Sequence, residues 1–361
     1  MNISEALSLM LDKGYCLWVG AGVTKHLTQK APLWNDLVNQ LEESANLPSN
    51  PRASFTERLE AVQKEIGRDS FQKQLRTNLF TPIADGVIEL ANNHSHPFTV
   101  PLCARQISSL GMMATSIVNF NFEPITSILF THLDENFRIK ALQPSDPRAV
   151  LANASIRFKN TKDRAYRSIY HPHGNLDIYG LCVATTSDYT NLEKTLAYQL
   201  ACHQAFEETL VIVGMSLEDA YLRQQITTFK SWISKIIWFV KKDSLSKEIK
   251  EWVALNSITT VDVSNWEKFW ELIEQKLPSP SKESSLHTWH MIIKKCFDFR
   301  RGTSRLSEFM STNGLPTEAM RQINKNKGLD ERKLEIAEIA DDTKKYHELT
   351  KAYLDEKKML I

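Results

Sequence analysis

Four short stretches of this 361-residue chain combine residue types that can bind phosphate or move a proton. The first follows the apolar run 17–19 and reads Gly20-Ala21-Gly22-Val23-Thr24. Small residues after a buried strand let the backbone come close to a ligand, and exposed N–H groups at the start of a helix bind phosphate oxygens. Small residues also end strands for packing reasons, so this turn alone favours a nucleotide site only weakly.

The spacing around this turn argues against a hydride-transferring dehydrogenase. The usual dinucleotide fingerprint has a third glycine, where this chain has Lys25, and an acidic residue at a strand end about 20 residues further on. Glu42 and Glu43 lie near that distance, but they fall in helix-like sequence. If the turn binds a nucleotide, the chemistry is of another kind.

Two asparagines and one histidine supply further polar chemistry. Asn119 and Asn121 alternate with phenylalanines, so on a strand their amides share one face and can hold sugar hydroxyls or a water. His173 precedes Gly174, and histidine suits proton transfer near neutral pH. The alternatives are polar residues at a strand end and a structural or exposed histidine. His171 lies two positions before His173, but no Cys, His or Asp spacing supports a metal site.

The fourth stretch is Gly214–Asp219, which follows a strongly apolar strand-like run. Ser216 can bond a phosphate or a ribose hydroxyl. Glu218 and Asp219 can instead cap the next helix, which is the ordinary role of acidic residues at that position. Because Ser216 lacks a Gly-x-Ser-x-Gly elbow, the sequence does not indicate a Ser-His-Asp triad.

Buried strands that alternate with helices must bring these stretches together. This alternation predicts an α/β fold with a parallel sheet and helices on both faces. Ligands of such sheets bind at the carboxyl ends of the strands, where Gly20, Asn119 and Gly214 are expected to lie. The strand-like runs are Tyr15–Val19, Thr115–Phe122, Thr209–Gly214, Lys235–Val240 and Ile258–Val263, with a strand-like entry at Ser168. Helix-like patterns between the first two strands include Phe55–Ile66, Phe71–Leu79 and Pro82–Leu90.

A proline- and serine-rich linker, Leu277–Ser281, divides the chain into residues 1–277 and an extension, 278–361. The extension is predicted to be all helical. In its last stretch, Asp330–Lys358, apolar residues recur about every seven positions, which favours an amphipathic helix on a partner or on the main domain. A solvated terminal helix is the alternative.

Composition narrows the class of protein. The net charge of +1 gives no global attraction to nucleic acid or to an anionic membrane. No apolar run is long enough to span a bilayer, and the N-terminus does not resemble a signal peptide. The five cysteines are scattered and form no CxxC pair, so neither a disulfide framework nor a structural zinc site is expected. The cytoplasm is the default location.

The four stretches occur in the order and spacing of the sirtuin family and, more specifically, resemble the sirtuin-like domains of bacterial antiphage systems. The resemblance covers roughly residues 1–277 and implies a Rossmann-like domain with a helical subdomain inserted within residues 34–110. Residues 20–24 resemble the family's Gly-Ala-Gly-[Val/Ile]-Ser, residues 117–121 its Thr-Thr-Asn-Tyr-Asp, residues 170–174 the segment with its catalytic His-Gly, and residues 211–219 its Gly-x-Ser-x-x-Asp.

The resemblance also assigns roles to individual residues. It implies Asn119 and His173 as the catalytic pair. Asn121 stands where the family has Asp, so its ribose contact is expected to be weaker or differently arranged. The paired zinc cysteines of protein-deacylating sirtuins are absent, so no zinc is expected. Contacts with NAD are implied for Gly20, Ala21, Gly22, Val23, Thr24, Asn121, Gly214 and Ser216.

The activity that the resemblance implies is that of an NAD glycohydrolase, with NAD as substrate rather than cofactor. It would deplete NAD in antiphage defence once activated by a partner or by oligomerisation. The resemblance therefore implies a homo-oligomer and an ATPase, translocase or other defence partner, with no membrane and only an indirect role for nucleic acid. The alternatives are a non-catalytic module that binds NAD or ADP-ribose, and a protein deacylase or ADP-ribosyl transferase.

Overall fold

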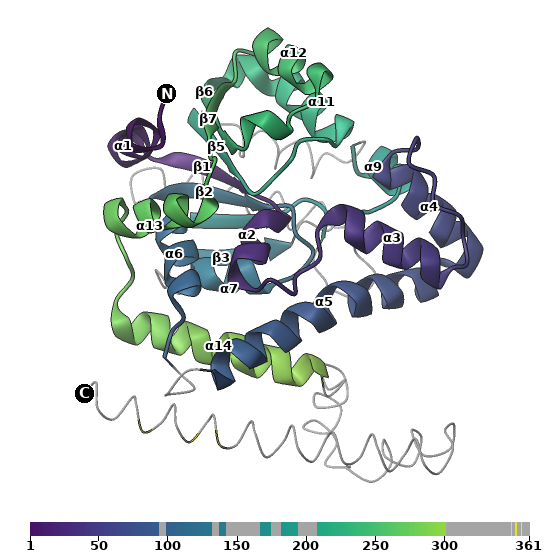
Figure 1. Ribbon diagram of the computed structural model, residues 1–361, viewed down its shortest axis with the longest axis horizontal. Helices are drawn as coiled ribbons and strands as arrows, with labels where there is room; N and C mark the ends of the chain where they lie inside the picture. Colours follow the sequence, from purple (N-terminus) through teal and green to yellow (C-terminus); the bar gives the residue numbers. More distant parts are fainter. Residues whose placement is uncertain are drawn as a thin grey trace.

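The computed structural model describes residues 1–93, 99–131, 137–141, 167–174, 182–193 and 208–300, with residues 348, 351 and 355 as isolated helical positions. Within these ranges, one parallel sheet of seven strands organises the fold, in the order β3-β4-β2-β1-β5-β6-β7 (Figure 1). The strands are β1 (Tyr15–Val19), β2 (Ala114–Asn119), β3 (Phe137–Ala141), β4 (Arg167–His171), β5 (Glu208–Val213), β6 (Ile233–Val240) and β7 (Thr259–Asp262). The predicted Rossmann-like α/β fold is confirmed.

The strand order reverses at β1, in the middle of the sheet. β2 to β4 lie on one side of β1, and β5 to β7 lie on the other. Such a reversal leaves a crevice at the carboxyl ends of the central strands. The register pairs Val19 of β1 with both Asn119 of β2 and Val213 of β5. The three strands therefore end side by side, which brings together the turns that follow them.

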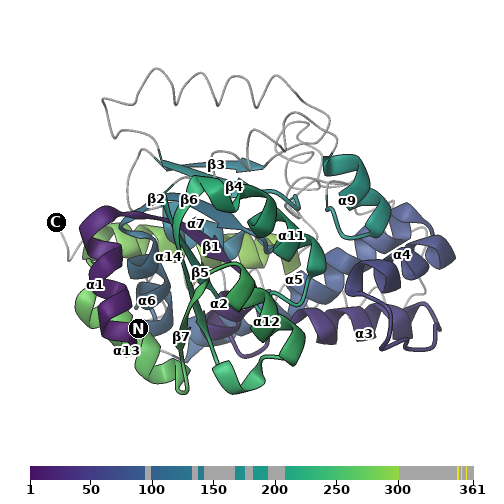
Figure 2. The same cartoon turned by 90° about the horizontal axis from the view of Figure 1, so that it is seen from above.

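The central strand β1 is buried along its whole length, and its alternate residues point to opposite faces of the sheet. Leu17 and Val19 pack in one hydrophobic cluster, and Cys16 and Trp18 pack in another. The first cluster is covered by α1 (Ile3–Lys13), α2 (Ala21–Leu27), α6 (Leu102–Gly111), α7 (Ile125–Thr131) and α13 (Trp266–Lys276), and the second by α9 (Thr186–Glu193), α11 (Ala220–Phe229) and α12 (Lys247–Leu255) (Figure 2).

Three helices between β1 and β2, called the inserted subdomain below, lie within the range 34–110 where the sequence predicts a helical insertion. These helices, α3 (Trp34–Ser44), α4 (Phe55–Ile66) and α5 (Arg68–Asn92), extend to one side of the sheet (Figure 1). Arg58 of α4 donates to both carboxylate oxygens of Glu42 of α3, at 2.8 and 2.6 Å, and both side chains are buried. Two parallel bonds of this kind fix the angle between the partners, so α3 and α4 hold a single arrangement.

The expected break between Phe71–Leu79 and Pro82–Leu90 is wrong, because α5 runs without interruption from Arg68 to Asn92 with Pro82 inside it. A proline removes one hydrogen bond and costs a helix about 3 kcal/mol. Here Phe80 and Ile83, on either side of the proline, are buried in the core. Burial of each such side chain contributes about 1.5–3 kcal/mol, so packing offsets the local cost.

The first helix after the linker, α14 (Lys282–Arg300), packs against α5 and α7. Its residues Trp289, Ile293 and Phe297 are buried in the same hydrophobic cluster as one face of the sheet. The Phe299 ring meets the Phe80 ring of α5 edge to face at 4.1 Å. The helices expected beyond residue 300, including Asp330–Lys358, lie outside the described residues.

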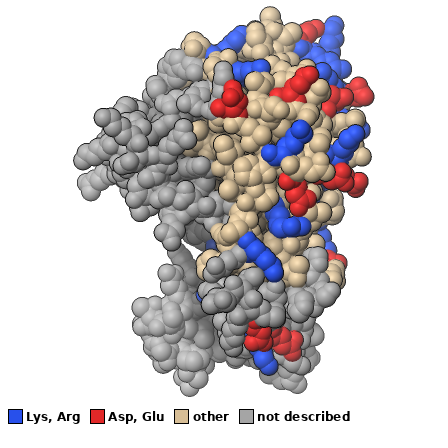
Figure 3. Space-filling model, turned by 90° about the vertical axis from the view of Figure 1, so that its left-hand side faces the viewer, with Lys and Arg blue, Asp and Glu red and all other residues tan. Residues whose placement is uncertain are grey.

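One face of the molecule carries charged side chains of both signs. On the face drawn in Figure 3, basic and acidic side chains are interspersed over the described residues. This mixture agrees with the net charge of +1. None of the helices in the described ranges is both long and apolar enough to cross a bilayer.

Candidate functional site

A cavity of about 760 Å³ lies at the carboxyl ends of β1, β5 and β6, where the strand order predicts a ligand site. The inserted subdomain lines one side of it with apolar side chains, among them Trp34, Phe55 and Leu59. The sheet side consists of the turn after β1, the loop after β5 and the end of β6. This volume falls within the usual range for ligand and cofactor pockets, about 300–1,000 Å³.

The turn after β1 and the loop after β5 are in backbone contact. The N–H of Gly20 donates to the Val213 carbonyl at 3.1 Å, and the N–H of Gly22 donates to the Gly214 carbonyl at 2.9 Å. Gly214 has a φ of +71°, which favours glycine. A Cβ on Gly22 would lie 2.8 Å from the Gly214 Cα, and a Cβ on Gly20 would lie 2.5 Å from the Gly214 carbonyl oxygen. The glycines are therefore required for packing.

This packing limits how the turn can hold phosphate. The N–H groups of Gly20 and Gly22 already donate within the protein, and the N–H of Val23 donates to the Gly20 carbonyl at 3.0 Å. Gly20, Ala21 and Gly22 line the cavity, whereas Val23 is fully buried. The phosphate contacts expected for residues 20–24 stay predictions.

Thr24, in α2 directly after the glycine turn, hydrogen-bonds the buried carboxylate of Glu123. Its hydroxyl donates to Oε1 of Glu123 at 2.7 Å and accepts from Nδ2 of Asn121 at 3.1 Å. Glu123 also accepts from the backbone N–H of Thr126 at 3.1 Å, and burial raises the pKa of its carboxyl. Since the amide nitrogen of Asn121 points to Thr24, its amide oxygen is the atom left to accept bonds in the cavity, which Asn121 lines.

Asn119 is fully buried and is not among the described residues that line the cavity. Its Nδ2 donates to the Ser127 hydroxyl at 2.9 Å, and its Oδ1 accepts from the Asn121 N–H at 2.9 Å. Ser127 in turn lies 2.7 Å from Nε2 of His171. The amide of Asn119 thus fixes the backbone of Asn121, while a direct contact of Asn119 with substrate stays a prediction.

The tautomer of His171 follows from this chain of bonds. Its Nδ1 lies 3.2 Å from the Asn121 carbonyl oxygen, which can only accept, so Nδ1 carries the proton. Nε2 then accepts from the Ser127 hydroxyl, whose oxygen accepts from Asn119. Burial lowers the pKa of His171 to about 4. His171 is a structural histidine that supports Asn119, and no metal role is needed to explain it.

His173 lines the cavity and has a different environment. Its Nδ1 lies 3.2 Å from the Tyr189 hydroxyl, and its Nε2 is buried without a hydrogen-bond partner in the described part of the chain. Its ring meets Phe120 and Tyr189 edge to face, with centroids 5.1 and 4.8 Å apart. Burial lowers the pKa of His173 to about 3, so the ring is neutral at pH 7. A neutral histidine with an unpartnered nitrogen at a cavity can accept a hydrogen bond from a water or a hydroxyl.

The backbone around His173 is fixed on both sides. Gly174 has a φ of +85°, which lets the chain turn immediately after the histidine. The Val183 N–H donates to the His173 carbonyl at 2.8 Å, and the neighbouring Cys182 carbonyl accepts from Nε2 of Gln72 in α5 at 3.3 Å. The histidine is therefore held between the sheet and the inserted subdomain.

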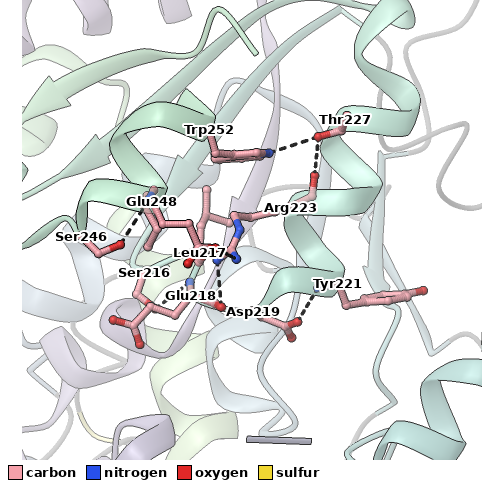
Figure 4. A network of polar contacts seen from close by, with 11 residues as sticks. Ser216, Leu217, Glu218, Asp219, Tyr221, Arg223, Thr227, Ser246, Glu248 and Trp252 are labelled. Carbon is pink, nitrogen blue, oxygen red and sulfur yellow. Dashed lines mark hydrogen bonds and ion pairs between the residues drawn. The ribbon is translucent and has the colours of Figure 1, made fainter. Parts of the chain in front are cut away.

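The loop after β5 forms another wall of the cavity and is braced from outside (Figure 4). Arg223 donates from Nη1 to the carbonyls of Leu217 and Glu218, at 2.9 and 3.0 Å, and from Nη2 to Oε1 of Glu248 at 2.8 Å. Leu217 is buried although its φ is +54°, a conformation that costs a non-glycine residue about 1 kcal/mol or more. These contacts hold the loop, and with it Ser216, in one shape.

Asp219 closes this loop as the N-cap of α11. Its side chain accepts from the Tyr221 N–H at 2.9 Å. The capping role given to Asp219 as the alternative from sequence is therefore present. Asp219 also lines the cavity, and burial raises the pKa of its carboxyl.

Comparison with known families agrees with this geometry. The model of the SIR2-like domain family matches residues 119–261, a span that begins at Asn119 and includes His173 and the loop after β5. The glycine turn at 20–24 lies outside the matched span. No curated protein matches the chain. Within the described ranges, no group of three or more His, Cys, Asp or Glu side chains is placed to hold a metal ion.

Proposed function

We propose, on the premise that this chain carries a SIR2-like domain, that it is an NAD⁺ glycohydrolase that releases nicotinamide and ADP-ribose. Domains of this family are NAD-dependent enzymes. The observation that carries the proposal is His173, a buried neutral histidine whose Nε2 has no partner among the described residues and which lines a cavity large enough for a dinucleotide. Hydrolysis of the nicotinamide–ribose bond passes through an oxocarbenium-like transition state, to which a water must be delivered and deprotonated.

His173 is assigned the role of general base in this proposal. Its Nε2 accepts a proton from the attacking water or from a ribose hydroxyl, which is worth about 10²- to 10⁴-fold in rate. The amide oxygen of Asn121 accepts from a hydroxyl or amide of the substrate on the same side of the cavity. Asn119 acts through Asn121, whose N–H it holds.

The apolar wall of the inserted subdomain excludes bulk water from this reaction. Trp34 of α3 and Phe55 and Leu59 of α4 line the cavity from this subdomain. Exclusion of water strengthens each polar contact inside the cavity and limits attack to one positioned water. The glycine turn and Ser216 are proposed to bind the phosphate and ribose part of the dinucleotide, as the sequence resemblance implies.

The test is nicotinamide release from NAD⁺ by the purified full-length chain and its variants. His173→Ala should lower kcat by about 10²- to 10⁴-fold. His287→Ala is the matched control, because His287 is an exposed histidine of α14 that is not among the residues lining the cavity. Unchanged turnover in both His173→Ala and Asn119→Ala would reject the catalytic assignment.

A binding module without turnover is the second candidate, and the buried position of Asn119 favours it. Its amide bonds to Ser127 and to the Asn121 N–H, and it does not line the cavity. Calorimetry separates the two candidates. Tight NAD⁺ binding without nicotinamide release under every activating condition would support the binding module.

Regulation completes the proposal, because an enzyme that consumes NAD must be silent until it is needed. We propose that oligomerisation or a defence partner such as an ATPase switches on the activity, and that NAD depletion in antiphage defence is the outcome. The helical extension, residues 281–361, is the proposed contact, and its last part, Asp330–Ile361, is the segment to delete. Deletion of this segment should change the oligomer mass measured by light scattering, and an unchanged mass with unchanged turnover would remove the segment from the switch.

A further inference from the structure

We propose that Lys241 binds a phosphate on the adenosine ribose of the dinucleotide, so that this site takes NADP⁺ and binds it more tightly than NAD⁺. This inference rests on the proposed function for turnover, but not for binding. Lys241 is the residue directly after β6, and its side chain lines the same cavity as His173.

The cavity extends from one side of the central strand to the other. His173 follows β4, on the β2 side of β1, whereas Lys241 follows β6, on the β5 side. Four strand spacings of about 4.8 Å separate the ends of β4 and β6 by about 19 Å. The turn after β1 and the loop after β5 lie between them. A dinucleotide with its nicotinamide ribose at His173 therefore has its adenosine over the ends of β5 and β6.

The chain from β5 to β6 is a strand–helix–strand unit of the kind that binds an adenosine ribose (Figure 1). Its first strand ends before Gly214, α11 follows, and β6 returns parallel to β5. The indole N–H of Trp238 donates to the Met215 carbonyl at 3.0 Å, which holds the loop after β5 against β6. In such units an acidic residue beyond the second strand bonds the 2′-hydroxyl of NAD, and a basic residue accommodates the 2′-phosphate of NADP. This chain has Lys241 at that place.

The ammonium group of Lys241 is available for a ligand. Its side chain is exposed and forms no ion pair with any residue in the described ranges. Lys25, the other lysine that lines the cavity, donates from Nζ to the carbonyls of Gln29 and Ala31. A lysine ammonium binds phosphate as a compact positive charge.

The acidic residues of the cavity wall lie at other places. Glu218 and Asp219 precede α11, and Glu267 lies in the first turn of α13. At the start of a helix, the helix dipole favours a negative charge. None of the three follows β6, where an acidic residue would bond the 2′-hydroxyl of NAD and repel a 2′-phosphate.

The bond that breaks is the same for both dinucleotides. Water adds to C1′ of the nicotinamide ribose as the bond to nicotinamide breaks, so NADP⁺ and water give nicotinamide, 2′-phospho-ADP-ribose and a proton. Lys241 lies at the far end of the dinucleotide and contributes equally to ground state and transition state. Its loss should therefore raise the KM for NADP⁺ and leave kcat unchanged.

Calorimetry with nucleotides tests the assignment without turnover. The probes are AMP, adenosine 2′,5′-bisphosphate and adenosine 3′,5′-bisphosphate, of which the last two carry the same charge. The full-length wild type should bind the 2′,5′ isomer about 10- to 100-fold more tightly than AMP, and more tightly than the 3′,5′ isomer. Lys241→Glu should abolish this preference. Lys242→Glu is the matched control, because it makes the same charge change at an exposed neighbour that is not among the residues lining the cavity.

Three results would overturn the role of Lys241. They are equal affinity of the wild type for AMP and the 2′,5′ isomer, equal affinity for the two bisphosphates, and equal effects of Lys241→Glu and Lys242→Glu. The last result would show a general effect of charge rather than a phosphate contact. Circular dichroism checks that each variant is folded, and Lys241→Gln, which removes only the charge, is the second variant.

Nicotinamide release from NAD⁺ and NADP⁺ separates this inference from the proposed function. The wild type should have the lower KM for NADP⁺, and Lys241→Glu should reverse that order. A preference for the 2′,5′ isomer without release from either dinucleotide would reject the glycohydrolase and leave the phosphate contact standing. Release from NAD⁺ by a protein without this preference would keep the glycohydrolase and reject the role of Lys241.

Discussion

Two buried neutral histidines should make the fold sensitive to mild acid. Burial lowers the pKa of His173 to about 3 and that of His171 to about 4, whereas histidine in an unfolded chain titrates near 6.5. Between these values the unfolded chain binds protons that the folded chain does not, so the free energy of unfolding falls as the pH falls below 6.5. A shift of one pKa unit corresponds to about 1.4 kcal/mol, so each histidine should remove about 2 kcal/mol between pH 7 and pH 5.

The perturbation that isolates this effect is His173→Gln, which keeps a polar side chain but does not titrate. Urea unfolding at pH 7, 6 and 5 should show that the wild type loses about 2 kcal/mol more than the variant over this interval. A comparison is needed because Glu123 and Asp219, whose pKa values are raised by burial, act in the opposite direction in both proteins. His287→Gln, at an exposed position of α14, is the control. Parallel pH dependence of the wild type and His173→Gln would refute a buried neutral His173.

Three further predictions follow from the walls of the cavity. Gly22→Ala places a Cβ 2.8 Å from the Gly214 Cα. Urea unfolding should therefore show a free energy of unfolding lower by about 1–3 kcal/mol. A stability equal to that of the wild type would show that the turn after β1 and the loop after β5 can move apart without cost. Arg223→Lys keeps the positive charge but loses the guanidinium group that donates to the carbonyls of Leu217 and Glu218. Hydrogen exchange at the Leu217 amide should therefore become faster. Unchanged exchange would mean that the loop is stable without Arg223. Glu123→Gln puts an amide donor where the carboxylate accepts three hydrogen bonds. It should reduce the free energy of unfolding by about 1–3 kcal/mol and weaken NAD⁺ binding measured by calorimetry. Unchanged values would argue against a buried carboxylate next to the turn.

The sheet could be predicted from sequence because its central strands are buried on both faces. Continuous apolar runs such as Leu210–Val213 leave little ambiguity. β3 was not predicted, because its five residues alternate apolar and basic types and, among the described strands, it pairs only with β4. The continuous α5 was missed for the opposite reason. Proline normally ends or kinks a helix, so a break was expected at Pro82. Burial of the surrounding residues keeps α5 helical through this position.

The site could be predicted in part, for a physical reason. Residues directly after strand ends must meet when the strands are adjacent and parallel, and Gly20 and Gly214 do so. Side-chain partners that come from other elements left no local signal. Glu123 resembles an ordinary acid at a helix start, yet it accepts from Thr24, 99 residues away in sequence. Tyr189 could have been found only by asking which hydroxyl lies next to His173, a question that needs coordinates.

The long helix α5 has a mechanical consequence. Its 25 residues span about 38 Å as a single rod. Near one end of α5, the Gln72 side chain donates to the Cys182 carbonyl. The next residue, Val183, donates its N–H to the His173 carbonyl. Further along the rod, Phe299 of α14 packs against it. Helix α14 is therefore connected to His173 through its packing on α5 and through the contact of α5 with Cys182. A displacement of α14 would move α5, and with it the backbone next to His173.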